Sequence, residues 1–376
     1  MRILYFSRSY TPHDRRFLVA LAGSPHEIWY LRLESDEVLY EARPAPPGVR
    51  ELDPLGQGGR LRTADEWIRL APRLEAVLER MRPDLVLAGP IQQCAFLTAL
   101  VGFDPLLAVS WGSDLLVDAQ RDEFWAWMTR YALRRSALLV TDCDAVSRKA
   151  RQLAGLAEDR IVQFPWGVDL ASFHPGRDEP AVRPRGWEDC IAVISTRSWE
   201  PSYGVLHLLE GFRLAWSADP RLRLLLLGDG TERDRVRRFL EDHHLGPVVH
   251  TLGAVAHEQL PAWFRAADVY ASCAYNDGSS LSLLEAMATG LPVLATDCDS
   301  NREWIAGPGN GYLAPFGEAA AIAGALLEMA AMSPAKRAEI GRANRLVVEK
   351  RADWRRNAQR LLEACERLAV PNQVTQ

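Results

Sequence analysis

Two carboxylates and several small polar residues lie within one short segment, YNDGSSLSLLEAMATGLPV, at positions 275–293. A helix turns about 100° per residue, so a helix over 280–289 places Glu285 on a stripe with Leu281, Leu284 and Ala288. A carboxylate among apolar side chains needs a hydrogen-bonding partner, because burying it alone is costly. That partner could be a bound ligand, or the start of the same helix, since Ser282 and Glu285 have the S-x-x-E spacing of a capping box.

The loop that leads into this helix has the features of a phosphate-binding site. A strand-like run, DVYAS, precedes it, and we expect the helix to end at Gly290, before Pro292. The first backbone amides of a helix have no partner within the helix and lie at the positive end of its dipole, so they can bind phosphate without a metal. The candidate amides belong to Gly278, Ser279, Ser280 and Leu281.

Composition narrows the class of protein. A chain of 376 residues with 48% hydrophobic content can bury about two domain cores. The net charge of −5 argues against a general nucleic-acid binder, which would carry a basic surplus. The six cysteines are scattered without a CxxC pair or a zinc-like His spacing, so we expect small core residues and no metal site. No apolar run reaches about 18 residues. We therefore expect a cytoplasmic protein, and peripheral attachment to the inner face of a membrane through surface arginines stays open.

Strand-like runs alternate with helical patterns along nearly the whole chain. The first series contains RILYFS, EIWYLRL, DLVLAG, LLAVSW, ALLVTD and IVQF, with helices expected at 66–81, 117–135 and 144–154. After a polar, proline-rich stretch at 174–189, the pattern restarts with CIAVIS, RLLLLGDG, VVHTLG, DVYASC and PVLATD. Short apolar runs separated by helices are typical of parallel sheets, so the two series predict an α/β protein with two Rossmann-like, doubly wound domains.

We expect an N-terminal domain at 1–178 and a C-terminal domain at 188–353, with an amphipathic helix at 354–376 that crosses back to the first domain. Ligands of open α/β sheets bind at the carboxyl ends of the strands, so two facing domains would hold the main site in the cleft between them. The turn LLLLGDG has only Gly228 and Gly230, which excludes the three-glycine dinucleotide pattern, and no GxxxxGK[ST] sequence indicates a phosphate-loop NTPase.

From Gly253 to Leu313 the sequence resembles the retaining, nucleotide-sugar-dependent glycosyltransferases of family four, which have the glycosyltransferase B fold. Their pattern is two acidic residues separated by seven, followed by EAMA-G-PV. Asp277 and Glu285 match it, with Asp in place of the usual first Glu. Further matches occur in family order over most of the chain, at RPDLVLAGP, WGSDLL, FPWGVDLASFHP, GVLHLLEGFRLA, LLLLGDG, LGAVAHEQLPAWFRAADVY and NREWIAGPGNGYL.

The resemblance implies a role for each matching residue. Glu285 would bind the ribose hydroxyls of the nucleotide, and Asp277 would hold hydroxyls of the transferred sugar. Arg197 would neutralise the leaving diphosphate, together with the amides of Ser280 and Leu281. Backbone groups that read the base would belong to Gly253, Ala254 and Val255.

Three departures from the family pattern affect the site. Tyr203 replaces the usual lysine six residues after the arginine, Trp111 replaces the histidine before GSD, and YTPHDRR replaces the Gly-Gly loop. Because Tyr203 supplies no positive charge, we predict that Arg15 or Arg16 approaches the diphosphate. The alternative is that both arginines are solvated charges in the first turn of a helix. Trp111 either contacts substrate or packs in the core.

The resemblance implies transfer of a sugar from a UDP- or GDP-linked donor to a glycan, a lipid-linked or a small-molecule acceptor, with retention of configuration. We expect no cofactor and no metal, because the leaving diphosphate can accept the acceptor's proton while positive groups of the protein stabilise its charge. Two other functions stay open: a sugar-nucleotide 2-epimerase of the same fold, and a catalytically silent partner subunit that binds nucleotide.

Overall fold

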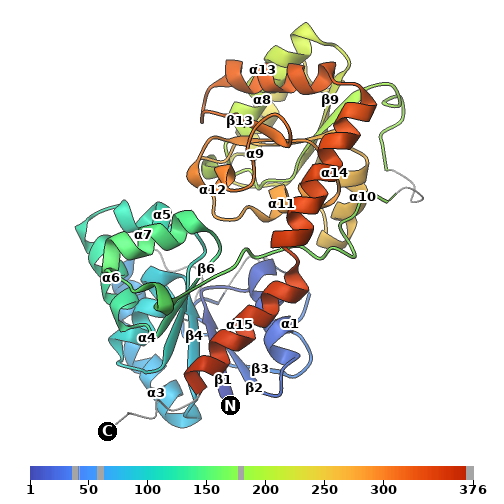
Figure 1. Cartoon of the computed structure of the whole chain (residues 1–376). Helices are drawn as coiled ribbons and strands as arrows, with labels where there is room; N and C mark the ends of the chain where they lie inside the picture. Colours follow the sequence, from blue (N-terminus) through green and yellow to red (C-terminus); the bar gives the residue numbers. More distant parts are fainter. Residues whose placement is uncertain (36–40, 42, 57–62, 177–181, 370–376) are drawn as a thin grey trace. The chain divides into compact units, whose positions relative to one another are not determined.

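The computed structural model describes residues 1–35, 41, 43–56, 63–176 and 182–369. The chain divides into two compact units, one of Met1–Phe164 with Arg355–Gln376 and the other of Pro165–Trp354. We call these unit 1 and unit 2. The predicted domain limit at 178 and the last part of the predicted helix, 370–376, lie outside the described residues. The helix that follows unit 2 belongs to unit 1, so the chain crosses back as the fold prediction has it (Figure 1).

Unit 1 contains a parallel sheet with the strand order β3-β2-β1-β4-β5-β6-β7. Its strands are β1 (Arg2–Ser7), β2 (Glu27–Arg32), β3 (Val49–Glu51), β4 (Leu85–Gly89), β5 (Leu106–Val109), β6 (Leu138–Thr141) and β7 (Ile161–Gln163). Its helices include α1 (Pro12–Ala22), α2 (Ala64–Ile68), α3 (Ala71–Met81), α4 (Phe96–Leu100), α5 (Ser113–Leu116), α6 (Glu123–Arg135), α7 (Asp144–Ala154) and α15 (Trp354–Ala369).

Unit 2 repeats this architecture with a parallel sheet in the order β10-β9-β8-β11-β12-β13. Its strands are β8 (Ile191–Ser195), β9 (Leu222–Leu227), β10 (Val249–Gly253), β11 (Val269–Ser272), β12 (Val293–Thr296) and β13 (Gly311–Ala314). Its helices include α8 (Val205–Ala218), α9 (Arg233–Asp242), α10 (Leu260–Arg265), α11 (Leu281–Ala288), α12 (Asp299–Arg302), α13 (Ala319–Ala331) and α14 (Pro334–Arg351).

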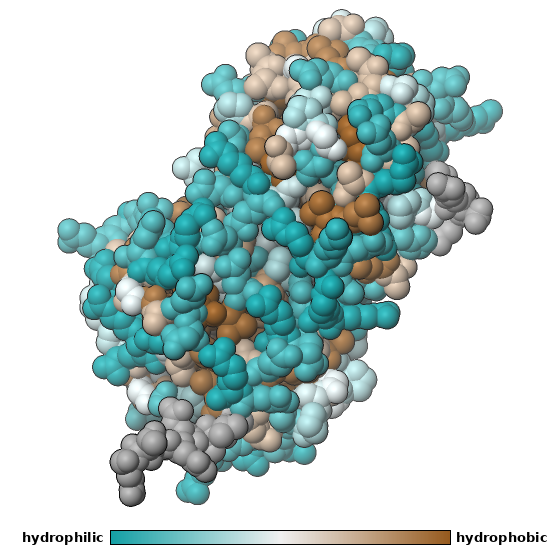
Figure 2. All heavy atoms as spheres, viewed as in Figure 1, coloured by the Kyte–Doolittle hydropathy of each residue, from teal (hydrophilic) through white to brown (hydrophobic). Residues whose placement is uncertain are grey.

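The composition of the strands explains why helices cover the sheets. Every residue of β4 and of β8 is buried, and both strands consist of Val, Ile, Leu and small residues. A parallel strand with such a continuous apolar run needs helices on both faces of its sheet, because neither face can meet water. Helices cover both faces in each unit (Figure 1). Hydrophilic residues predominate on the outer face shown in Figure 2.

Two predicted helices have different boundaries in the structure. The helix expected at 66–81 is two helices, α2 and α3, and Pro72 lies in the first turn of α3, where its missing N–H is tolerated. The helix expected at 117–135 begins only at Glu123, because the Asp122 side chain accepts the Trp125 amide and caps it. The predicted strands all form, and β3 and β13 are additional strands of three and four residues.

A glycine contact holds α11 against α14. A Cβ atom at Gly341, in α14, would collide with the carbonyl oxygen of Gly290, the left-handed residue after α11. We expect Gly341→Ala to lower the free energy of unfolding by about 3 kcal/mol, because the two backbones must separate. Gly324→Ala is the matched control: Gly324 is also helical, and a Cβ there meets nothing within 4 Å. Denaturant unfolding should show the control unchanged or stabilised by about 0.5–1 kcal/mol; equal losses would contradict the contact argument.

Candidate functional site

The candidate residues of unit 2 follow the carboxyl ends of its strands. Arg197 lies after β8, and Asp277 lies in the loop between β11 and α11. Because β8 and β11 are parallel neighbours, these two loops leave the sheet side by side. The structure therefore brings together Arg197, Asp277 and the start of α11.

Arg197 is the centre of this arrangement. Its Nη2 atom lies 2.8 Å from Asp277 Oδ2, and the two side chains are 12% and 21% exposed. Its Nη1 atom donates to Ser280 Oγ at 2.9 Å and to Ser282 Oγ at 3.2 Å. Burial is the largest single influence and opposes the charged form, but Asp277, Tyr203 and Tyr270 together outweigh it, so the pKa of Arg197 is raised above its ordinary value. A fixed positive charge thus lies at the N-terminus of α11.

Asp277 is held by contacts with its own surroundings. Its Oδ2 atom is buried and lies against the Arg197 guanidinium. The loop itself is fixed, since Ser300 Oγ donates to the Asp277 carbonyl oxygen at 2.5 Å. The contact of this carboxylate with hydroxyls of a sugar stays a prediction.

Tyr203 supports Arg197 from one side. The guanidinium carbon of Arg197 lies 4.1 Å from the centre of the Tyr203 ring, within the range of a cation–π contact. Gly204, which follows, has a φ of 62°, and a Cβ there would collide with the Cys273 carbonyl oxygen. The residue that replaces the usual lysine therefore positions the arginine rather than adding a charge.

Glu285 has a protein partner. Its side chain is 3% exposed, and Oε1 lies 3.0 Å from Nε2 of His257, whose own side chain is 30% exposed. The capping-box alternative is wrong, because α11 begins at Leu281 with Ser280 as N-cap, so Ser282 lies within the first turn. Sequence reasoning missed His257, since it precedes Glu285 by 28 residues. His257 thus holds one carboxylate oxygen of Glu285, and the binding of ribose by this carboxylate stays a prediction.

The predicted base-reading loop follows β10. Gly253 has a φ of 67°, a conformation that favours glycine, and its carbonyl oxygen accepts the Gly228 amide at 2.8 Å. Ala254 is exposed and Val255 is half-buried. His257 begins the next turn, so the loop is connected within a few residues to the partner of Glu285.

In unit 1, Trp111 packs among aromatic residues. Its ring centre lies 5.4 Å from that of Phe17 and 5.7 Å from that of His13. The Trp111 backbone amide donates to Asp114, whose carboxylate also accepts from the Ile91 amide. Burial raises the pKa of Asp114 to about 6, against the effect of these donors. The half-buried Trp111 ring is thus held by α1, and its contact with substrate stays a prediction.

Arg15 and Arg16 are both half-buried residues of α1. This helix is capped by Thr11 and Asp14, which form a capping box. The arginines therefore occupy defined helical positions close to the helix start. Their approach to a diphosphate stays a prediction.

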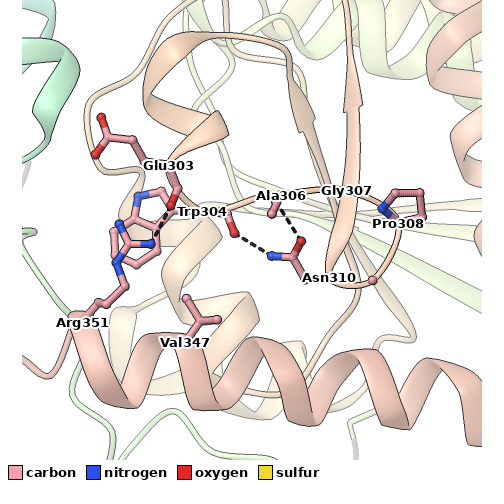
Figure 3. A pocket seen from close by; sticks show the side chains of 9 residues that line it. Glu303, Trp304, Ala306, Gly307, Pro308, Asn310, Val347 and Arg351 are labelled. Carbon is pink, nitrogen blue, oxygen red and sulfur yellow. Dashed lines mark hydrogen bonds between the residues drawn. The ribbon is translucent and has the colours of Figure 1, made fainter.

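A pocket of about 510 Å³ lies elsewhere in unit 2, beside the loop after α12 (Figure 3). Arg351 lies over the Trp304 ring, 4.2 Å from its centre, and donates to the Glu303 carbonyl oxygen. Asn310 ties the loop together by donating to the Trp304 carbonyl and accepting the Ala306 amide. None of the predicted site residues lines this pocket.

Comparison with known proteins shows what the C-terminal part of the chain resembles. Residues 187–361 match the family model of glycosyl transferases group 1. This segment, nearly half of the chain, is thus similar to the group 1 glycosyltransferases. It is 30% identical over 234 residues to the D-inositol 3-phosphate glycosyltransferase of Pseudarthrobacter chlorophenolicus, covering 61% of this chain and 55% of that protein. It is 33% identical over 215 residues to the phosphatidyl-myo-inositol mannosyltransferase of Mycolicibacterium smegmatis, covering 56% and 53%. The matches thus span about half the length of these relatives.

Solved structures confirm the predicted fold of this chain. Sucrose-phosphate synthase from Thermosynechococcus elongatus superposes with a TM-score of 0.80 at 20% identity, covering 98% of this chain and 99% of that one. HepE of Anabaena, in complex with UDP, gives a TM-score of 0.77 at 18% identity, covering 98% and 100%. The predicted glycosyltransferase B fold is therefore confirmed. No helix within the described residues is long and apolar enough to span a membrane.

Proposed function

We propose that this protein transfers a sugar from a UDP- or GDP-linked donor to an acceptor hydroxyl, with retention of anomeric configuration. The observation that carries this proposal is the Arg197 guanidinium, which lies at the start of α11 beside the carboxylate of Asp277. Solved HepE structures contain UDP and UDP-glucose, and the relatives named above act, by their names, on D-inositol 3-phosphate and on phosphatidyl-myo-inositol. These names support a glycan, lipid-linked or small-molecule acceptor.

In this proposal, the site residues of unit 2 bind different parts of the donor. Arg197 and the first amides of α11, from Ser280 and Leu281 with the preceding Gly278 and Ser279, stabilise the leaving diphosphate as its charge grows. Asp277 fixes hydroxyls of the sugar, and Glu285 binds the ribose. The diphosphate accepts the proton of the acceptor hydroxyl, so no protein nucleophile is required. We further propose that Arg15 or Arg16 adds positive charge, and that Trp111 contacts substrate.

Thermal-shift measurements with nucleotide-sugars test the donor. A ligand present at 100 times its Kd stabilises a protein by about 2.7 kcal/mol, which a melting curve resolves. The donor so found is then incubated with candidate acceptors, and the anomeric configuration of the product is read by NMR. Conversion of UDP-GlcNAc without an acceptor would instead identify an epimerase. Binding without transfer or slow donor hydrolysis would identify a silent partner subunit.

We predict that turnover does not require a divalent metal. The positive potential at the diphosphate would come from Arg197 and from the helix dipole, which is equivalent to about half a charge. The predicted result is unchanged turnover in the presence of EDTA. Loss of turnover in EDTA, restored by Mn²⁺ or Mg²⁺, would refute this prediction.

A further inference from the structure

Helix α6 turns aromatic side chains toward solvent. Phe124 and Trp127 are 45% and 43% exposed, and Tyr131 follows one turn later on the same side. Their rings form a continuous row, with centres 5.7 Å apart between Phe124 and Trp127 and 5.4 Å apart between Trp127 and Tyr131. We call Phe124, Trp127 and Tyr131 the aromatic face of α6.

Two residues of this face, Phe124 and Trp127, are exposed, whereas Tyr131 is half-buried against the core of unit 1. The residues of α6 that pack inward lie on other sides of the helix and are fully buried: Met128, Thr129, Ala132 and Leu133. Buried Phe96 contacts the inner edges of Trp127 and Tyr131, with ring centres 5.6 and 5.7 Å away. Trp127 and Tyr131 therefore pack against Phe96, while Phe124 and Trp127 remain exposed to solvent.

Arginines surround the aromatic face. Arg121, Arg134 and Arg135 are exposed, and Arg130 is half-buried. At about 100° per residue, Arg130 and Arg134 lie along one side of the aromatic row and Arg135 along the other. The Arg135 guanidinium carbon lies 4.7 Å from the centre of the Tyr131 ring. The two acidic residues here, Asp122 and Glu123, are confined to the start of the helix.

We propose that the aromatic face of α6 binds an anionic lipid surface. Trp and Tyr combine an apolar ring with a polar edge, which suits the boundary between water and acyl chains. Arginines on both sides can reach lipid phosphates, and their attraction is local, since the whole chain carries a net charge of −5. An extended negative surface is complementary to this row of rings, which has arginines on both sides.

Vesicle co-sedimentation tests the proposal. The full chain should bind vesicles of phosphatidylcholine with about 30% phosphatidylglycerol more tightly than vesicles of phosphatidylcholine alone, and added salt should reduce the difference. Arg134→Gln with Arg135→Gln should lower partitioning about 30-fold, equivalent to about 1 kcal/mol for each arginine. Phe124→Ser with Trp127→Ser should lower it at least about 10-fold.

Val19→Ser is the matched control, because Val19 is 43% exposed on α1 of the same unit; it should leave vesicle binding unchanged. All variants alter exposed side chains, so each is expected to fold. Thermal unfolding measurements check this. The proposal is overturned if the wild-type chain binds neither kind of vesicle, or if the double variants bind as the control does. It is also overturned if the wild-type chain dimerises in solution through this face and the Phe124/Trp127 variant is a monomer.

Discussion

Replacing Arg197 with alanine is expected to lower turnover about 10³-fold while the protein remains folded. In the proposed reaction, Arg197 donates to the departing diphosphate, and removal of one such donor costs an enzyme about 10²–10³ in kcat. Arg197 is also the ion-pair partner of Asp277. Without Arg197, the Asp277 carboxylate would be held less firmly toward the sugar. Single-turnover kinetics at saturating donor measure this effect directly.

Two further variants show whether the lost turnover is specific to the guanidinium of Arg197. Arg197→Lys keeps the charge but not the planar fork that reaches Asp277, Ser280 and Ser282, so it should restore only part of the rate. Arg221→Ala removes an exposed arginine paired with Asp219 and should leave turnover unchanged. Arg197→Ala with wild-type turnover would exclude Arg197 from the reaction. A parallel loss in the melting temperature would indicate a structural role instead.

Glu285→Gln and Asp277→Asn are expected to impair different steps: the first nucleotide binding, and the second turnover. Glu285→Gln should weaken nucleotide binding about 10- to 100-fold, because charge-assisted hydrogen bonds to the ribose are worth about 1.5–3 kcal/mol. Asp277→Asn should lower kcat about 100-fold with little change in the Kd for the nucleoside diphosphate, since in the proposed reaction Asp277 holds the moving sugar and not the nucleotide. Calorimetry with the nucleoside diphosphate and steady-state kinetics separate the two effects.

His257 supplies the control for this comparison. His257→Gln can still donate to Glu285 Oε1, whereas His257→Ala cannot, so the alanine variant should resemble a mild form of Glu285→Gln and the glutamine variant should recover affinity. Nucleotide affinity that is unchanged in Glu285→Gln would mean that the carboxylate serves only His257 and its own helix. The ribose assignment would then be wrong.

Much of the architecture could be predicted from local patterns. The alternation of short apolar runs with helices predicts parallel sheets because each strand buries both faces, and β4 and β8 do so. The end of α11 was predictable at Gly290, whose φ of 83° few other residues adopt. The strand β3 was not predictable, since two of its three residues are exposed and have no apolar periodicity.

Within the site, the sequence indicates residue types and their order, and the tertiary structure decides the partners. The spacing of Asp277 and Glu285 is visible in the chain, but each carboxylate meets its partner, Arg197 or His257, across a long sequence separation. The sequence likewise shows that Tyr203 lacks the charge of a lysine. Only the fold shows that its ring lies against the guanidinium of Arg197.

Helix α6 illustrates the same division. Its sequence, EFWAWMTRYALRR, has apolar side chains on two sides, so periodicity alone cannot say which side enters the core. Packing against α4 and α7 buries Met128, Ala132 and Leu133 and leaves Phe124 and Trp127 in water. Local sequence determines that a helix forms, because that depends on backbone propensity and capping by nearby residues. Which side faces solvent depends on the shape of surfaces that distant parts of the chain provide, and only the folded protein decides it.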